Sequence, residues 1–198
     1  MRIDPSEQTS RDNYQLMIAS VIPRPIGWVS TLAADGTPNL APFSYFGAVT
    51  AAPPTLMLSV GRRRGQRKDT ARNLLDTREA VVHIPHRRLA EAMVKTSIEA
   101  GPELNEFDFA GLGQTPAEKV RPARVIEAAI AFECRVRQHI EVGTGPNDLF
   151  LLEILLIHIA DELLDGRLPD PAKLAAVGRL GGTGYCDTSA PFFIERPR

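Results

Sequence analysis

Apolar and polar side chains alternate along residues 127–143. Seven of the eight even-numbered positions from Ala128 to Val142 are apolar, whereas six of the eight odd-numbered positions beside them are polar. A period of two residues is typical of a long strand with one buried and one solvated face. The next run, Leu149–Ala160, is apolar on both faces and predicts a central strand. Turn-forming residues at 143–147 predict that the two strands form a hairpin.

A second hairpin is predicted near the start of the chain. Residues Ile26–Ala33 and Thr37–Ala41 are the expected strands, and Asp35-Gly36 between them is a strong signal for a tight turn. Two further short apolar runs, Thr55–Val60 and Ala80–Ile84, are expected to be strands as well. Short strands joined by tight turns favour an antiparallel sheet over a regular alternation of strands and long helices.

Helical signals are fewer and shorter. The segment Asp69–Thr77 begins with Asp69 as the expected capping residue and contains the apolar pair Leu74 and Leu75. The segment Arg87–Ser97 places its apolar side chains on one face. The pattern therefore predicts a single domain over residues 1–198 of the mainly β class with small α additions, built as a closed or partly closed antiparallel β-barrel.

The composition is that of a globular domain rather than a disordered chain. Of the 198 residues, 43% are hydrophobic and 24% are charged. The 23 basic and 24 acidic side chains give a net charge of −1, which argues against a general nucleic-acid partner. The chain also carries 16 prolines and 15 glycines, a proline content that disfavours a helical bundle and suits many turns.

The chain shows neither a secretory leader nor a membrane span. Its longest apolar run, Leu149–Ala160, contains Glu153 and His158 and is far shorter than the roughly 20 residues of a membrane helix. The two cysteines, Cys134 and Cys186, imply no disulfide framework and have no histidine partners at ligand spacing, so no metal is expected. We therefore expect a cytoplasmic protein that does not contact membranes.

A basic run stands between an expected strand and an expected helix. Five cations fall within residues 62–68, and this run has three interpretations. It is a solvated loop, a nucleic-acid contact or an anion pocket. The nucleic-acid interpretation lacks interleaved aromatic residues. The third interpretation rests on Lys68, Asp69 and Thr70, because a helix start offers free N–H groups and the positive end of its dipole beside an ammonium and a hydroxyl.

Several stretches together resemble the flavin-reductase-like family, which contains flavin reductases and flavoredoxin-type proteins on an FMN-binding split barrel. The resemblance spans about residues 10–186, and each of its pieces is weak alone. The pieces are Pro23-Arg-Pro-Ile-Gly-Trp-Val-Ser-Thr31, Asn39-Leu-Ala-Pro-Phe-Ser-Tyr-Phe46, Lys68-Asp-Thr-Ala-Arg-Asn73, Glu106-Phe107, Phe132-Glu-Cys134 and Val177-Gly-Arg-Leu-Gly-Gly182 followed by Tyr185.

The resemblance implies a homodimer that binds FMN, with FAD as a possible substitute, near the subunit interface. Two stretches of the match would line the isoalloxazine ring and the ribityl chain, and a third would face the phosphate. The implied cofactor-binding residues are Trp28, Ser30 and Thr31, then Ser44, Tyr45 and Phe46, and, for the phosphate, Lys68, Asp69 and Thr70.

This chain departs from the family pattern at two positions. Gly47 and His83 stand where many members have asparagine, and either change would alter hydrogen bonding around the flavin. Some matched residues also have a purely structural interpretation. Trp28 and Phe46 could be core aromatics, and Tyr185 is equally suited to the core and to the site.

Two functions follow from the resemblance. In the first, the protein is an NAD(P)H-dependent flavin reductase that passes a hydride from nicotinamide to flavin N5, and it could supply reduced flavin to a partner oxygenase. No residue is assigned to catalysis, because the flavin carries the hydride transfer. In the second, it is a flavoredoxin-like electron carrier that holds FMN tightly and exchanges electrons with a protein.

Overall fold

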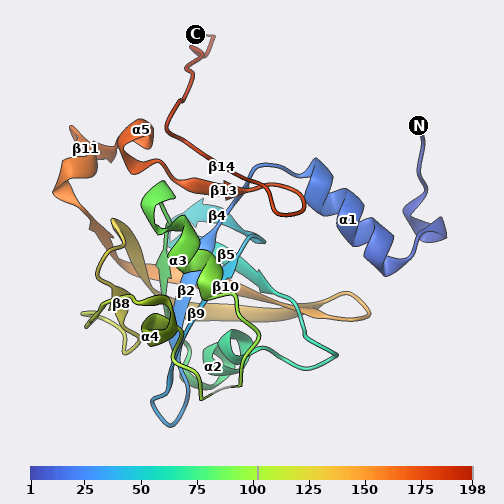
Figure 1. Ribbon diagram of the computed structural model, residues 1–198, viewed down its shortest axis with the longest axis horizontal. Helices are drawn as coiled ribbons and strands as arrows, with labels where there is room; N and C mark the ends of the chain where they lie inside the picture. Colours follow the sequence, from blue (N-terminus) through green and yellow to red (C-terminus); the bar gives the residue numbers. More distant parts are fainter. Residues whose placement is uncertain (102, 198) are drawn as a thin grey trace.

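A computed structural model of the protein describes residues 1–101 and 103–197 (Figure 1). It contains five α-helices in its described part: α1 Ser10–Ser20, α2 Asp69–Thr77, α3 Ala90–Lys95, α4 Glu106–Ala110 and α5 Pro171–Leu174. Seven strands form the main sheet: β2 Gly27–Leu32, β3 Pro38–Phe43, β4 Phe46–Ala51, β5 Pro54–Val60, β6 Glu79–His83, β9 Ile130–Val142 and β10 Asn147–Ile159. The smaller sheets use β1 Arg24–Pro25, β7 Gln114–Thr115, β8 Arg124–Val125, β11 Leu164–Asp165, β12 Leu168–Pro169, β13 Val177–Arg179 and β14 Tyr185–Asp187.

The main sheet closes on itself as a split barrel. Its strand order is β3-β2-β6-β9-β10-β5-β4, and every neighbouring pair is antiparallel. β3 and β4 are therefore the two edges, yet only Ser44 and Tyr45 separate them along the chain. Two edges joined by two residues must lie close together, so the sheet curls into a barrel. The expected mainly β, antiparallel barrel is confirmed.

The barrel buries two apolar clusters on opposite faces of its strands. The inner cluster includes Val29, Phe150 and Leu152, all without solvent exposure. The outer cluster includes Trp28 and Phe107, where α3 and α4 cover β3. Trp28 and Val29 are adjacent in β2 and point to opposite faces, as the two-residue period of a strand requires.

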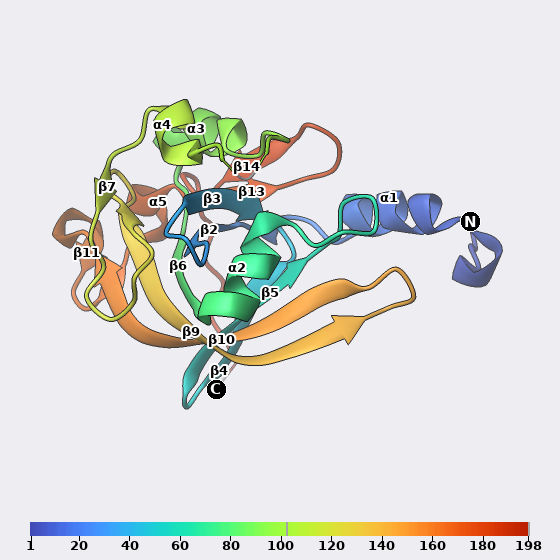
Figure 2. The same ribbon diagram turned by 90° about the horizontal axis from the view of Figure 1, so that it is seen from below.

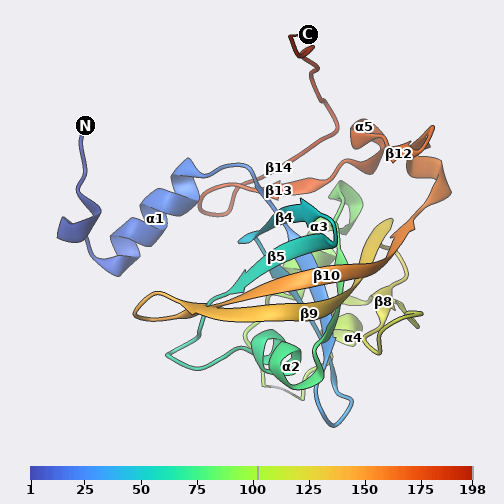
Figure 3. The ribbon, with the colours of Figure 1, turned by 180° about the vertical axis from the view of Figure 1, so that it is seen from behind.

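The expected strands and hairpins agree with the structure to within a few residues. β9 and β10 pair over their whole length with two register shifts, and the hairpin that joins them extends beyond the barrel (Figures 2 and 3). β2 and β3 pair from Gly27↔Phe43 to Leu32↔Pro38. The bounds of α2 are those expected, whereas the expected segment Arg87–Ser97 consists of a 3-10 turn followed by the shorter α3.

One local expectation is wrong, and one helix was not expected. Asp69 is not the cap of α2: Lys68 holds the N-cap position, and no side chain caps the helix, so Asp69 is the first helical residue. The helix α1 was not expected, and none of its residues is buried. Figures 1 and 3 show α1 projecting away from the barrel, joined to it through β1. Among the described residues, no helix has the length and apolar character needed to cross a bilayer.

Candidate functional site

A cavity of about 490 Å³ lies where the first turn of α2 approaches β3. Three segments surround it: the strand β3, the β5–α2 loop that continues into α2, and the residues that follow α3. The lining residues are Asn39, Ala41, Pro42 and Phe43 from β3, Arg63, Arg64, Gln66, Arg67, Lys68, Asp69, Thr70 and Arg72 from the loop and α2, and Thr96, Ser97, Ile98, Glu99, Ala100 and Glu106. Cationic side chains are concentrated along the loop side of this cavity.

The N-terminus of α2 opens into the cavity with its backbone donors uncapped. Lys68 occupies the N-cap position in an extended conformation, and its side chain makes no capping hydrogen bond. The Lys68 ammonium lies 5.9 Å from the centre of the Phe43 ring, within reach of a cation–π contact. Thr70 also lines the cavity. Free N–H groups, an ammonium and a hydroxyl form a donor set that suits a phosphate group.

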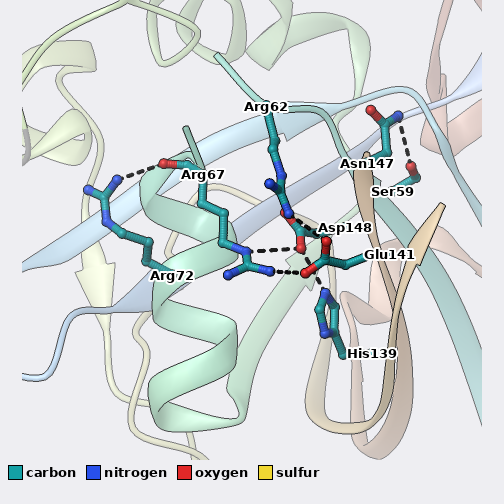
Figure 4. Close-up of polar contacts among 8 residues, drawn as sticks. All are labelled: Ser59, Arg62, Arg67, Arg72, His139, Glu141, Asn147 and Asp148. Atoms are coloured by element: carbon teal, nitrogen blue, oxygen red, sulfur yellow. Dashed lines mark hydrogen bonds and ion pairs between the residues drawn. The ribbon is translucent and has the colours of Figure 1, made fainter. Parts of the chain in front are cut away.

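The five cations of the basic run have different roles. Arg62 and Arg67 form ion pairs with carboxylates of the β9–β10 hairpin (Figure 4). Arg63 pairs with Glu99 at 2.6 Å, on the far side of the cavity. Among the ion pairs of the described residues, Arg64 and Lys68 have no carboxylate partner. Two of the five cations are therefore available to an anionic ligand, and both line the cavity.

A buried network of neutral side chains fixes α2 on the sheet. The Asn39 amide donates to Thr70 Oγ1 at 2.9 Å and to Thr31 Oγ1 at 3.2 Å. The Asn73 amide donates to the same Thr31 hydroxyl at 3.1 Å. All four side chains are less than a tenth exposed. Among the described residues the Thr70 hydroxyl accepts from Asn39 and finds no acceptor for its own proton, which leaves that proton for a ligand.

Glu106 adds one carboxylate to the cavity wall. Its Oε2 accepts the backbone N–H of Leu40 at 3.0 Å, on the outer edge of β3. Burial raises the pKa of Glu106, partly offset by that hydrogen bond, and the neighbouring Asp69 raises it further. This carboxyl therefore takes up a proton more readily than an exposed glutamate does.

Comparison with known proteins identifies the family of the chain. The model of the "Flavin reductase like domain" family matches residues 19–172. The chain belongs to this family. It is 34% identical in sequence to nitrilotriacetate monooxygenase component B from Bacillus cereus, whose crystal structure superposes with a TM-score of 0.94 over 98% of both chains.

Two further solved structures are similar to this chain over its whole length. The 2-nitrobenzoate 2-nitroreductase NbaA of Pseudomonas fluorescens is 29% identical, with a TM-score of 0.86 over 100% of this chain and 96% of that protein. A protein from Shewanella frigidimarina described as a flavin reductase with a split barrel domain has a TM-score of 0.86 over 100% and 99% of the two chains. At 16% identity this last likeness shows the fold alone, and that fold is the split barrel.

The cavity of this flavin-reductase-like domain includes three of the nine expected cofactor residues. Lys68, Asp69 and Thr70 line it. Asp69 also forms an ion pair with Arg72, its neighbour one turn along α2. In the part of the chain that the structure describes, the other six expected residues do not line this cavity.

The residues expected on the first matched strand are buried. Trp28 has no exposed surface, and its indole N–H donates to Thr96 Oγ1 at 2.8 Å. Thr31 belongs to the network beneath α2. The Ser30 hydroxyl is buried and has no hydrogen-bond partner within the described chain. These three residues are buried and do not line the cavity, and the hydrogen bond from Trp28 reaches the lining residue Thr96.

The β3–β4 connection is used for packing as well. The Ser44 hydroxyl accepts a hydrogen bond from the Arg24 side chain. Arg24 is buried and also donates hydrogen bonds to the carbonyls of Ile18 and Val21 at the end of α1. The Tyr45 hydroxyl is buried without a partner among described residues, and burial raises the pKa of Tyr45.

Phe46 packs against Gly27. A Cβ at position 27 would approach the Phe46 ring to 2.8 Å, which explains the glycine in the matched motif. The glycine at position 47 is less constrained, since a Cβ there would meet only the end of Met57 at 3.7 Å. The expected roles of Ser44, Tyr45 and Phe46 at a flavin remain predictions.

His83 is locked in the core in its neutral form. Its Nδ1 lies 2.9 Å from the carbonyl oxygen of Trp28, and its Nε2 accepts the backbone N–H of Val125 at 3.0 Å. Nε2 therefore carries no proton, and Nδ1–H is the donor. Complete burial lowers the pKa of His83 to about 4. His83 belongs to β6, and its two hydrogen bonds connect this strand to Trp28 in β2 and Val125 in β8. His83 does not line the cavity.

Sequence reasoning missed part of the cavity. Asn39 and Phe43 line the cavity and belong to a matched motif, but the resemblance implies a cofactor role only for the last three residues of that motif. The residues Thr96–Ala100 follow α3 and carry no recognisable signal, because only the tertiary fold brings them opposite the basic loop. Glu106 belongs to a matched piece of the family resemblance, and its raised pKa depends on burial that no sequence pattern shows.

Proposed function

We propose that the protein is an NAD(P)H-dependent flavin reductase that binds FMN in the cavity at the N-terminus of α2. The observation that carries this proposal is the phosphate-suited donor set of Lys68, Thr70 and the uncapped α2 amides, in a chain of the flavin-reductase-like family. Bound FMN would supply the redox chemistry, accepting a hydride from the reduced nicotinamide and passing the electrons on.

The residues of this chain would bind and orient the cofactor. The α2 amides and Lys68 would hold the phosphate, with Arg64 as a second cation on the loop side. The Thr70 hydroxyl would donate its free proton to a phosphate oxygen, while Asn39 fixes the position of that hydroxyl. Glu106 would accept a hydrogen bond from a hydroxyl group of the ligand. FAD shares the same phosphate and remains an alternative cofactor.

An absorbance spectrum of the purified protein tests this proposal. Added FMN should bind with a dissociation constant in the micromolar range or below, and anaerobic NADH or NADPH should bleach the bound flavin. A protein that neither binds FMN nor oxidises either nicotinamide in its presence contradicts the proposal. If flavin survives dialysis and neither nicotinamide bleaches it, the protein is instead an electron carrier of the flavoredoxin type.

We further propose that the reductase acts in the cytoplasm as a homodimer and delivers reduced flavin to a monooxygenase. The similar Bacillus cereus protein is component B of a monooxygenase, which supports the choice of partner. Apolar side chains of α1, among them Tyr14, Leu16 and Met17, are exposed although an isolated helix of this length is marginally stable in water. A second copy would cover them. Light scattering that shows a monomer still binding FMN would contradict the dimer.

A further inference from the structure

The β5–α2 loop is fastened to the β9–β10 hairpin near both of its ends. Arg62, at the start of the loop, pairs with Glu141 at 2.9 Å, and Arg67, near its end, pairs with the other oxygen of the same carboxylate. Arg67 Nε also donates to Asp148 Oδ1 at 3.0 Å. Figure 4 shows the two guanidinium groups reaching the same pair of hairpin carboxylates.

Asp148 is the buried centre of this cluster. Its side chain has no exposed surface, and its Oδ1 accepts His139 Nε2–H at 2.8 Å as well as Arg67. Its Oδ2 lies 3.6 Å from Arg62 Nε. Burial alone would raise the pKa of Asp148, but the hydrogen bonds from His139 and Arg67 and the charges of both arginines hold it below the usual value.

The cluster is an ion-pair network rather than a metal site. The ligand atoms of His139, Glu141 and Asp148 lie within 4.8 Å of one another, as they would around a metal ion. However, both Glu141 oxygens and one Asp148 oxygen already accept hydrogen bonds from arginine. Two guanidinium charges therefore balance the two carboxylates, and a cation would have to displace them.

The loop between the two fastened arginines carries residues that line the cavity. Arg63, Arg64 and Gln66 lie between these arginines, Lys68 follows directly after Arg67, and all four contribute to the cavity wall. The Arg67 carbonyl is held as well, since it accepts the Arg72 side chain of α2 at 2.7 Å (Figure 4). Loops rarely keep a fixed geometry without such support, and a binding site needs its donors held within about 0.5 Å.

We propose that Glu141 and Asp148 are positioning residues for the anionic end of the ligand. By engaging Arg62 and Arg67, they hold the β5–α2 loop so that Arg64 and Lys68 face the cavity. These carboxylates would thus govern the affinity of the site for a phosphate monoester, although neither lines the cavity. The proposal rests on the proposed function for the identity of that ligand, FMN.

The test compares Glu141→Gln with Glu153→Gln. Glu153 is the control, because it lies on the same hairpin and pairs with Arg137 rather than with the loop; its side chain is 14% exposed, against 47% for Glu141. Asp148→Asn is the stronger variant and keeps the side-chain shape. Glu141→Gln is the safer one, because Glu141 is 47% exposed and its loss should leave the fold intact. Each protein is measured for melting temperature, FMN affinity and tryptic cleavage without cofactor.

Trypsin provides a readout that does not depend on the cofactor, since it cleaves after the arginines and lysine of residues 62–68. We expect Glu141→Gln to bind FMN about threefold more weakly and Asp148→Asn about tenfold more weakly, with faster cleavage in this loop. Glu153→Gln should match the wild type in both measurements. The melting temperature of Glu153→Gln should fall at least as far as that of Glu141→Gln, so weaker FMN binding by Glu141→Gln alone separates loop positioning from general stability.

The outcomes separate the two proposals. If wild-type protein fails to bind FMN, the proposed function is wrong, and loop cleavage still decides whether the carboxylates position the loop. If wild-type protein binds FMN while Glu141→Gln and Asp148→Asn bind it equally well and are cleaved like Glu153→Gln, the positioning role is wrong. Reduced affinity in all three variants would also overturn it, because the effect would then belong to the hairpin as a whole.

Discussion

Two polar networks hold the same segment of the chain from opposite sides. On one side, Asn39 joins Thr31 and Thr70 through neutral hydrogen bonds beneath α2. On the other side, Asp148 and its neighbour Glu141 hold the β5–α2 loop through ion pairs. Neutral hydrogen bonds depend little on salt or pH, whereas ion pairs depend on pH and, where they are exposed, on salt as well. The helix start is thus fixed by interactions that do not vary with conditions, and the cationic loop beside it by interactions that do.

The largest expected effect comes from Asp148→Ala. The substitution leaves Arg62, Arg67 and His139 without their buried acceptor, which should lower the free energy of unfolding by about 3 kcal/mol. Urea unfolding at neutral pH measures this loss.

The loss should also depend on pH. The folded-state pKa of Asp148 is lowered, so its stabilisation is fully present above the ordinary value of 3.8 and is lost as the pH falls through the folded value. The difference in stability between the wild type and Asp148→Ala should therefore be constant from neutral pH to about pH 5 and shrink below about pH 4. A difference that stays constant through this range would show that the ion pairs are not its source.

His83 gives a pH response that belongs to neither network. Its folded-state pKa of about 4 lies below the ordinary histidine pKa of 6.5, so between these values the unfolded chain binds a proton that the folded chain does not. Stability is therefore full above pH 6.5 and falls by about 3 kcal/mol as the pH drops toward 4. His83→Gln can keep both hydrogen bonds without titrating.

Thermal unfolding from pH 7 to pH 4 should show this fall in the wild type and a flatter curve in His83→Gln. Asn39→Ala should retain the fall unchanged. If Asn39→Ala flattened the curve as His83→Gln does, the fall would not originate at the core histidine.

Asn39→Ala should lower the free energy of unfolding, measured in urea, by about 2 kcal/mol. The substitution removes the two buried hydrogen bonds that the Asn39 amide donates to Thr31 and Thr70. This cost should be the same at low and high salt, unlike the cost of Glu141→Gln, whose carboxylate is exposed. Asn39→Asp offers a contrasting variant, since it removes the amide donor and adds a charge beside Asp69 and Glu106. A salt-dependent cost for Asn39→Ala would contradict the neutral character of this network.

The two networks also differ in how far the sequence predicts them. An antiparallel barrel follows from period-two alternation in β9 and from the turn signals between strands, and its split form follows from the family resemblance. Lys68, Asp69 and Thr70 follow from a helix start beside a basic run. Asp148 could not be found in this way. It stands at the start of an apolar strand, where an isolated acid looks like an exposed strand end, and its burial depends on arginines about 80 residues away in sequence.

A similar limit explains Trp28. The matched motif contains the tryptophan, but the alternation of β2 cannot say which face of the strand meets the cofactor and which meets the core. Only the packing of α3 and α4 over β3 places Trp28 against Thr96 on the outer face. The sequence thus predicts which residues of a strand share a face. What that face packs against depends on contacts between residues distant in sequence.

The smallest expected effect on stability is that of Glu141→Gln, and it tests the comparison most finely. Its carboxylate is 47% exposed, and such pairs contribute about 0.5 kcal/mol or less at physiological salt. We expect a small loss in the free energy of unfolding at low salt that disappears near 1 M salt, where the Debye length is about 3 Å. The loss for Asp148→Ala should persist at that salt concentration, because its carboxylate has no exposed surface. Equal salt dependence of the two variants, measured by urea unfolding, would mean that water reaches Asp148 as freely as Glu141, and the ionic network would then be a surface feature rather than a buried support for the loop.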